Sequence, residues 1–549
     1  MARHPKNIRR AWAPCVACVA WAALVAVDVS AQPRIAVEDR PMAPDRAASA
    51  ATALAALTAA STAASTAALT ATAVPSPLHR VDGMVLLDYQ AISLPQHQSL
   101  DLMGAHILNK VNDWLYLGIG AYAPLFKGEY GGFMAFDIAM LAQRKIWGNV
   151  FANAAFSVGG GGGGKSVQQS IVLSGTGGFA RGALGLGYDF GEFAVGANVA
   201  RIKFKNSAID STRLNVYVEV PFSYLAGPYQ SFGSKLSVAD VREVSAEPSK
   251  NVVSVGLVKV MQINPKGSVK ANFQLVDFQF SRFLTDHVYW YASLGAGYQG
   301  LPLYNQLIGG LGYRVDVAPR LKLHAQLGVG SGGYAPEKIQ TGTGLLVYPK
   351  MSAEYDLAKN VSMSLVGGYL AAPNGTSKNY TLGASLNYHG SSGGLAAGDD
   401  VRFKGYRFSL FQQTDFNLYY RDVKRPAVDM LALQLDSLIS PNLYIPIQAS
   451  IAYGPYQGFP GYGEVLAGIG VQTEYSPDQR LQYFAELMGG GSAHGLIVKA
   501  GVGANYGLSD RLAIRASLGA AKGPSSDGRN FKTNSAGLGM TYRFSLPGW

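Results

Sequence analysis

Cysteine, charge and long hydrophobic runs are all scarce in this chain of 549 residues. Its two cysteines, Cys15 and Cys18, lie near the N-terminus, so the remainder can form no disulfide and no cysteine-ligated metal site. Asp, Glu, Lys and Arg make up 15% of the chain, against about 25% in a typical soluble domain. Beyond the N-terminus there is no strongly hydrophobic run of about 20 residues, which excludes a bundle of membrane-spanning helices.

Glycine and tyrosine are abundant instead, with 66 and 30 residues, and the mean hydropathy is slightly positive at +0.09. A transmembrane β-barrel tolerates this composition, because its strands alternate lipid-facing and lumen-facing residues. From about Val81 the hydrophobic pattern has a period of two, which is typical of strands. The pattern is clearest at the end of the chain, where one face carries Leu538, Met540, Tyr542 and Phe544. We therefore predict an all-β, antiparallel transmembrane barrel.

The first 31 residues have the layout of a secretory signal peptide. Basic residues precede an uncharged stretch, Ala11–Val27, and small residues then place cleavage between Ala31 and Gln32. An uncleaved anchor helix is the alternative, but the apolar stretch is short and ends in a small-residue site. Residues 32–80 are rich in Ala, Thr and Ser, which predicts a flexible tether.

The rest of the chain reads as three homologous units of about eight strands each. We place them at 81–224, 252–389 and 406–549, with linkers at 225–251 and 390–405. Matching landmarks are a Tyr that opens a tight turn, a Tyr near a strand start, and a Gly cluster: Tyr188, Tyr355 and Tyr506; Tyr116, Tyr289 and Tyr444; Gly159–Gly164, Gly328–Gly333 and Gly489–Gly491. The units could share one barrel of about 24 strands or form three tandem barrels of about eight. Long linkers favour separate barrels, whereas a single terminal assembly strand favours one, and we weight the second argument slightly more.

These features resemble the Gram-negative outer-membrane β-barrel proteins as a class. The resemblance rests on the signal peptide, the cysteine-free mature chain, turns such as Leu508–Leu512, and the last strand. It implies the Gram-negative outer membrane as location, with membrane lipid and lipopolysaccharide as surroundings. It also implies that periplasmic chaperones and the barrel-assembly machinery are partners. That machinery would read Leu538, Met540, Tyr542 and Phe544, with Phe544 or Trp549 as the terminal aromatic residue.

Three patterns resemble chemical sites, and we interpret each as structural. Gly159–Ser166 matches the nucleotide-binding P-loop, but a strand rather than a helix is predicted after it, so a loop or bent strand is the better interpretation. The histidines are scattered, which predicts no metal site. Asp286 and His287, with Ser281, could suggest a hydrolase, but they fall in a predicted periplasmic turn and no nucleophile elbow is present. We predict no catalytic residue, cofactor or metal, and no enzymatic activity.

Aromatic residues are interpreted as girdles at the two membrane interfaces. The relevant residues are Trp114, Tyr116, Tyr122, Tyr289, Trp290 and Tyr291. A carbohydrate-stacking surface inside the barrel is the alternative interpretation.

Two functions follow from the predicted fold. The first is a pore or export channel for small solutes or an envelope polysaccharide. The alternative is a non-conducting surface scaffold or adhesion protein built of tandem barrels, which is favoured by the many Gly, Ala, Ser and Tyr residues on the predicted inner face. The net charge of +11 is spread along the chain without a basic block, so nucleic acid is not a predicted partner. The sequence points to no particular substrate or oligomeric state.

Overall fold

The computed structural model describes most of the chain after Ser76. The described residues are 78–94, 99–163, 173, 175–235, 249–263, 272–301, 304–333, 339–358, 361–392, 402–454, 461–475, 479–524 and 530–548. The predicted cleavage site at Ala31 and Gln32, and nearly all of the predicted tether, lie outside these ranges. No helix within them is long and apolar enough to cross a membrane.

Barrel 1 is a closed antiparallel ring of eight strands, in sequence order, and β1 pairs with β8 to close it. Its strands are β1 (His79–Ser93), β2 (Ser99–Lys110), β3 (Leu115–Ala123), β4 (Met134–Trp147), β5 (Val150–Gly162), β6 (Gly178–Asp189), β7 (Ala194–Phe204) and β8 (Asp210–Ala226). A short 3-10 turn, Tyr229–Ser231, follows β8.

Barrel 2 is a second closed ring of eight strands, in which β9 pairs with β16. Its strands are β9 (Ser249–Gln262), β10 (Phe273–Phe283), β11 (Val288–Gln299), β12 (Asn305–Ala318), β13 (Leu321–Gly333), β14 (Leu345–Ala358), β15 (Val361–Ala371) and β16 (Lys378–Ser392).

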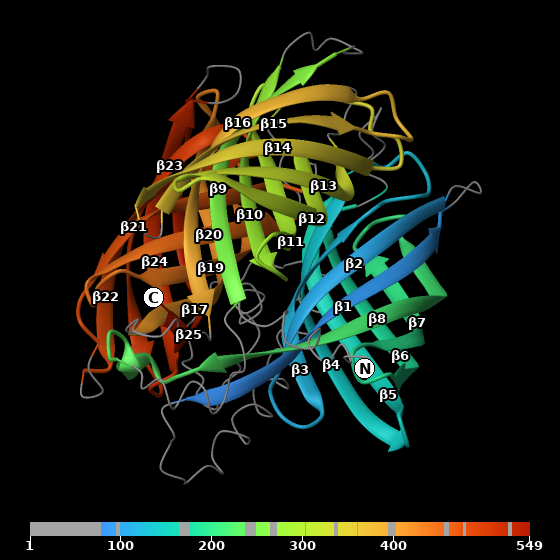
Figure 1. Cartoon of the computed structure of the whole chain (residues 1–549), viewed down its shortest axis with the longest axis horizontal. Coiled ribbons are helices and arrows are strands. Elements are labelled where there is room, and N and C mark those ends of the chain that lie inside the picture. Colours follow the sequence, from blue (N-terminus) through green and yellow to red (C-terminus); the bar gives the residue numbers. More distant parts are fainter. Residues whose placement is uncertain are drawn as a thin grey trace, which may run out of the picture.

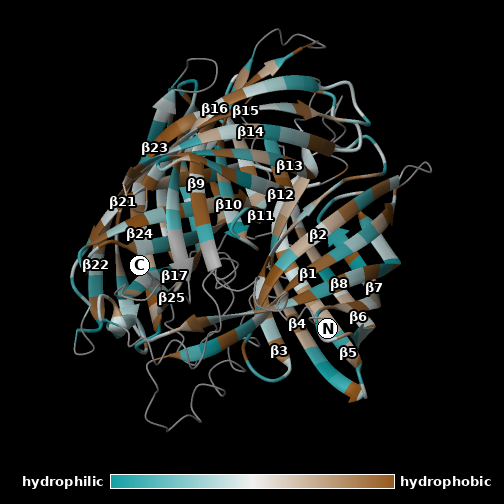
Figure 2. Cartoon of the chain, in the orientation of Figure 1, coloured by the Kyte–Doolittle hydropathy of each residue, from teal (hydrophilic) through white to brown (hydrophobic). Residues whose placement is uncertain are grey.

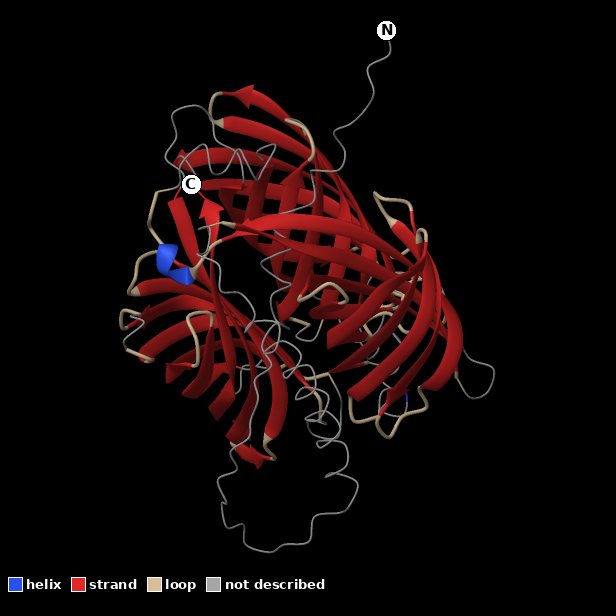
Figure 3. Cartoon of the chain, turned by 90° about the horizontal axis from the view of Figure 1, so that it is seen from below, coloured by secondary structure: helices blue, strands red, loops and turns tan. Residues whose placement is uncertain are grey.

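Barrel 3 closes through β17 and β25, and the short β18 pairs only with β17. Its strands are β17 (Arg402–Tyr420), β18 (Val423–Arg425), β19 (Val428–Leu438), β20 (Leu443–Ala452), β21 (Gly463–Gln472), β22 (Leu481–Ser492), β23 (Gly495–Gly507), β24 (Leu512–Pro524) and β25 (Asn530–Gly548). Without β18, this ring too has eight strands. Figures 1 and 3 show the three barrels side by side, with hardly any structure other than strands and loops.

The three barrels confirm the all-β fold and its tandem form, and the slightly favoured single wall of about 24 strands is wrong. The physical reason is the pairing of the first and last strand within each unit. His79–Tyr89 pair with Val216–Ala226, for example, so no edge remains open for the next unit. One C-terminal strand is compatible with three barrels, because β25 closes only its own ring.

The three barrels begin and end within four residues of the units expected from the sequence, with one correction to the tether. β1 begins at His79, so His79 and Arg80 belong to barrel 1 and not to the tether. In barrel 1, β6 begins at Gly178. Gly175 and Gly177 have φ values of 54° and 92°, a left-handed conformation that does not fit a regular strand.

The landmarks of the three units fall on equivalent strands. Tyr188, Tyr355 and Tyr506 lie on β6, β14 and β23, each the sixth strand of its ring, and are 45%, 46% and 46% exposed. Tyr116, Tyr289 and Tyr444 lie on β3, β11 and β20, each the third strand of its ring. The three rings therefore share one plan at these positions.

Each barrel has two ends that differ in their connections. We call the end at which the first strand begins and the last strand finishes the terminal end, and the opposite end the loop end. In barrel 2 the terminal end carries the connections 284–287, 319–320 and 359–360, whereas the loop end carries 263–272, 300–304, 334–344 and 372–377. Short periplasmic turns and longer outer loops are the pattern of outer-membrane barrels.

Like ends of the barrels meet. At the loop end, the amide of Gly131 in barrel 1 donates to the carbonyl of Gly342 in barrel 2 at 3.0 Å. At the terminal end, Gly227 forms a β-bridge with Ser545 of barrel 3. A buried apolar cluster joins barrels 1 and 3 there, and Trp290 of barrel 2 packs against it; its buried members are Val81, Phe222, Tyr224, Ala226, Phe408, Tyr542, Phe544 and Leu546. The three barrels are thus oriented alike and can cross one membrane together.

Large exposed hydrophobic side chains are concentrated on the outer arc of each barrel. They include Leu184, Leu214 and Val216 in barrel 1, Leu311, Met351 and Leu365 in barrel 2, and Leu487, Leu518 and Leu538 in barrel 3. Hydrophobic and hydrophilic residues alternate along many of these strands (Figure 2). Exposed apolar side chains of this kind on an outer wall are suited to lipid.

Candidate functional site

The interior of barrel 3 is filled by a charged network. Arg515 lies 3.0 Å from Glu486, and Arg407 lies 2.9 Å from Asp436. Arg407 and Arg543 are 0% exposed and Arg515 is 2% exposed. Further polar and aromatic partners are Gln434, Gln482, Tyr444, Phe411 and Phe484. Buried ion pairs with their polar and aromatic partners thus occupy this interior, and removing one charge would leave its partner buried and uncompensated.

The interior of barrel 1 is filled in a similar way. Arg181 donates to Asp88 at 2.6 Å and to Gln90 at 3.1 Å. His106 lies 3.2 Å from Asp137, and its ring contacts that of Tyr122 edge-on. Apolar side chains occupy both ends of the barrel beyond this polar layer.

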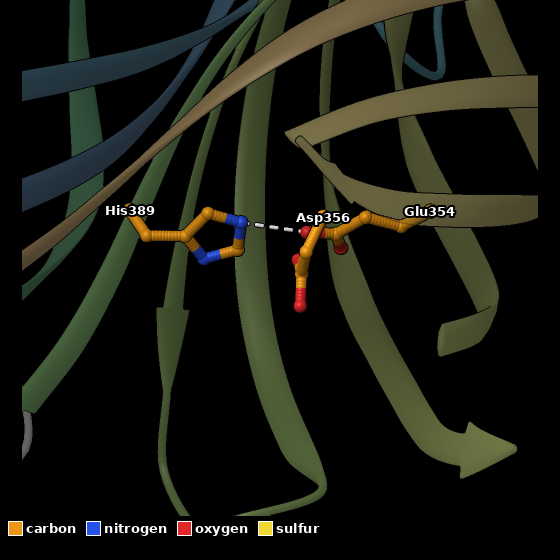
Figure 4. A group of neighbouring side chains, drawn as sticks. All are labelled: Glu354, Asp356 and His389. Atoms are coloured by element: carbon orange, nitrogen blue, oxygen red, sulfur yellow. Dashed lines mark ion pairs between the residues drawn. The ribbon is translucent and has the colours of Figure 1, made fainter. Parts of the chain in front are cut away.

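Barrel 2 holds a network centred on Glu354, close to its terminal end. The Glu354 carboxylate lies 2.7 Å from Nε2 of His324 and 2.6 Å from Nε2 of His389, and Ser362 donates to it at 2.6 Å. Figure 4 shows the His389 ring directed at Glu354, with Asp356 beside it. Glu354 and Asp356 share the inward face of β14 because side chains alternate along a strand.

Lys350 lies farther toward the loop end on the same face. It donates to Gln279 at 2.7 Å, and its ammonium lies 4.8 Å from the ring centre of Tyr291. Between Lys350 and Glu354 the barrel leaves a cavity of about 60 Å³, which is room for a few waters and not for a sugar. This is a far smaller space than a solute channel needs.

The chemistry open to the Glu354 network follows from its partners. Ligand atoms of Glu354, Asp356 and His389 all lie within 4.8 Å of one another, a spacing that a metal ion could bridge. Both oxygens of Asp356, however, lie 2.7 Å from Nζ of Lys322. Since a lysine already neutralises Asp356 and two histidines and a serine contact Glu354, the arrangement is a satisfied polar network within the described chain.

Glu354→Ala is expected to destabilise barrel 2 by about 2 kcal/mol, because His324, His389 and Ser362 lose their shared acceptor in a buried place. The measurement is the heating temperature at which the purified protein changes its migration on SDS gels. Ser352→Ala is the matched control, since Ser352 lies on the same face of β14 and has no part in the network. An equal effect of the two substitutions would contradict the assigned role of Glu354.

The structure corrects the interpretation of the aromatic residues. Tyr122, Tyr289 and Tyr291 are at most 1% exposed and point into their barrels, so they form no girdle at the membrane interface. Space for two of these rings comes from glycines. A Cβ on Gly312 of the neighbouring strand would meet the ring of Tyr289, and a Cβ on Gly328 of β13 would meet the hydroxyl of Tyr291. Trp114 is 47% exposed, as a girdle residue would be.

The P-loop pattern begins inside a strand. Gly159–Gly162 belong to β5, and Lys165 and Ser166 lie outside the described residues. A Cβ on Gly159 would come within 1.9 Å of the carbonyl oxygen of Phe136, so close packing in the wall explains this glycine. Gly160 faces barrel 3, where a Cβ would come within 2.6 Å of the carbonyl oxygen of Ala452. Gly159 and Gly160 therefore belong to the barrel wall, where close approach of neighbouring backbone explains them.

The remaining predicted residues fall in different places. His287 lies in the connection between β10 and β11, where Nδ1 is 3.0 Å from the carbonyl oxygen of Arg314, and Ser281 lies inside barrel 2. In the predicted assembly signal, Leu538 is 64% exposed on the lipid-facing arc. Tyr542 and Phe544 are 9% and 1% exposed, because they pack in the cluster between barrels.

No protein-family model and no curated protein matches the chain. Among solved structures, a ferric enterobactin receptor from Pseudomonas aeruginosa has 9% identity and a TM-score of 0.27, covering 85% of this chain and 81% of its own. OccK5 (OpdH) of the same organism has 9% identity and a TM-score of 0.20, covering 86% and 98%. KdgM porin has 8% identity and a TM-score of 0.15, covering 53% and 98%. These structures belong to the outer-membrane β-barrel class that the sequence resembles.

Proposed function

We propose that the protein is a non-conducting scaffold of three barrels in the outer membrane of a Gram-negative bacterium. The observation that carries the proposal is the closure and filling of each barrel. Eight strands leave room for side chains alone or for one small ligand, and buried arginines and carboxylates occupy barrels 1 and 3. The exported polysaccharide considered from the sequence would need a much wider lumen.

The outer-membrane placement is supported by the lipid-compatible arcs and by the common orientation of the barrels. In this placement the terminal ends face the periplasm, where the signal peptide would deliver the chain, and the loop ends face outward. Interaction with periplasmic chaperones and the assembly machinery is part of the same proposal.

A narrow channel through barrel 2 is the second candidate, and one observation favours it. The cavity of about 60 Å³ beside Lys350 is lined by polar side chains such as Gln326 and Ser364. A path of this width could pass water or small ions only.

Purified protein inserted into planar bilayers is expected to give no conductance steps, because buried side chains occupy barrels 1 and 3 and the cavity beside Lys350 in barrel 2 measures about 60 Å³. Insertion is verified separately by flotation of proteoliposomes, and a porin reconstituted in parallel is the positive control. Steps of conductance would overturn the scaffold proposal. If their ion selectivity changed sign in Lys350→Glu, the path would run through barrel 2.

A further inference from the structure

We propose that the outer wall of barrel 3 carries a binding site for a phosphorylated glycolipid of the lipid A type. The inference rests on the proposed outer-membrane placement, because it requires the loop end to face the leaflet that holds this lipid. It starts from two lysines on neighbouring strands. Lys522 of β24 and Lys532 of β25 are direct partners in the strand register, and both are exposed.

Two like charges in direct opposition destabilise a sheet unless something neutralises them. Among the described residues, no carboxylate pairs with either lysine. Six lysines elsewhere do have a carboxylate or amide partner, as Lys145 has in Asp189 and Lys322 in Asp356. Nζ of Lys532 lies 4.6 Å from the centre of the Tyr419 ring. A cation–π contact fixes the ammonium group without removing its charge. The pair is therefore suited to an external anion.

The two lysines belong to a row of side chains that crosses four strands. Val498, Lys522, Lys532 and Tyr419 are successive register partners on β23, β24, β25 and β17. An irregularity at Asn417, whose φ is 49°, separates Phe416 from Tyr419 in that register. A bulge of this kind redirects the side chains that follow it.

The next row toward the membrane centre is made of small residues. Ala500, Ala520 and Asn534 are its successive register partners. With the lysine row they line a groove of about 460 Å³ in the wall, a size in the range of small-ligand sites. Below it the apolar arc resumes with Val502 and Leu518, which are 59% and 62% exposed.

The lysine row lies toward the loop end and the apolar groove lies next to it, toward the membrane centre. This order matches that of the charged headgroup and the acyl chains of a lipid at the membrane interface. The paired lysines fit phosphate, which they would contact as point charges. The amides of Asn417 and Asn534 border the groove and can hydrogen-bond sugar hydroxyls, and the alanine row accommodates acyl chains. A phosphorylated glucosamine lipid carries all three features, whereas a simple phospholipid carries no sugar hydroxyls that are held in a ring.

Barrel 1 offers a natural control. Arg201 and Lys203 also lie near the loop end, but Asp210 neutralises them at 3.1 Å and 3.2 Å. A general attraction of basic residues to anionic lipid would involve both barrels. A specific binding site would involve Lys522 and Lys532 alone.

The test measures the affinity of the full-length protein in detergent for bisphosphorylated lipid A, by native mass spectrometry or thermophoresis. Lys522→Gln combined with Lys532→Gln is expected to weaken binding roughly thirtyfold, because the variant lacks two positive charges next to the anionic headgroup. Arg201→Gln combined with Lys203→Gln should leave the affinity within about twofold. Migration on unheated SDS gels verifies that each variant is folded.

Two further probes identify the ligand chemistry. Lipid A without phosphates should bind the wild type and the Lys522→Gln, Lys532→Gln variant equally, because this lipid has no phosphate for the two lysines to contact. An undiminished affinity of this variant, an equal loss in the Arg201→Gln, Lys203→Gln control, or equally tight binding of phosphatidylglycerol would overturn the proposal. Conductance in bilayers would refute the scaffold function and leave these affinity ratios unaffected, so the two failures are distinguishable.

Discussion

Proteolytic cleavage of the two junctions between barrels is expected to leave three folded barrels. Protease sites inserted within 236–248 and 393–401 lie between strands that close separate rings. All the ladder hydrogen bonds of a ring lie within that ring, so cutting a junction breaks none of them. Each fragment should migrate as a compact band on unheated SDS gels and shift separately on heating.

A cut inside a barrel is the control for this experiment. A site inserted within 334–338 separates β13 from β14, but these strands stay paired in the same wall. The two fragments should therefore run together until heat unfolds barrel 2. Loss of all compact bands after cleavage of the junctions would show that the barrels do not fold as separate units.

In a mild detergent that does not denature the protein, the cleaved barrels should remain associated with one another. The cluster of Phe222, Tyr224, Tyr542 and Phe544 buries aromatic side chains between barrels 1 and 3, and the backbones of Gly227 and Ser545 exchange two hydrogen bonds there, of 2.8 and 3.0 Å. Buried aromatic side chains hold a complex together mainly through the apolar area that they remove from solvent. Size-exclusion chromatography in mild detergent would then give one peak for the cleaved protein.

The strands could be predicted from the sequence because their signal is local. Alternating side chains, together with Gly and polar residues between them, define most strand positions within a few residues, as in β3 and β7. Closure is not local. Whether β8 pairs with β1 or with β9 depends on contacts across a whole unit, and both arrangements satisfy the same alternating pattern.

The interior networks were missed for a related reason. Arg181 and Asp88 form an ion pair across 93 positions of the chain, and His389 and Glu354 lie on different strands, so spacing along the sequence carries no sign of either. The buried tyrosines did have a detectable signal. Tyr289 and Tyr444 each have a glycine partner on the next strand, Gly312 and Gly470, whose missing side chain makes space for a ring inside the barrel.

Replacing Arg515 with alanine is expected to destabilise barrel 3 by about 4 kcal/mol, the size typical of breaking a buried ion pair from one side. Glu486 would stay buried and charged, with only Tyr444 and Gln434 as hydrogen-bond donors. The guanidinium also lies 4.0 Å from the ring centre of Phe484, so a cavity would add to the loss. The measurement is the temperature at which the barrel 3 fragment, released by junction cleavage, loses its compact migration.

Two variants show whether the buried charge is the cause. Arg515→Met combined with Glu486→Leu removes both charges and keeps most of the volume, so it should recover most of the stability lost in Arg515→Ala. Arg201→Ala breaks an ion pair with Asp210 on the exposed surface of barrel 1, where Arg201 is 62% exposed, and should have no measurable effect. If Arg515→Ala were as mild as Arg201→Ala, the interior of barrel 3 would have to be hydrated well enough to solvate Glu486. That result would contradict a sealed interior and make barrel 3 a candidate conducting path.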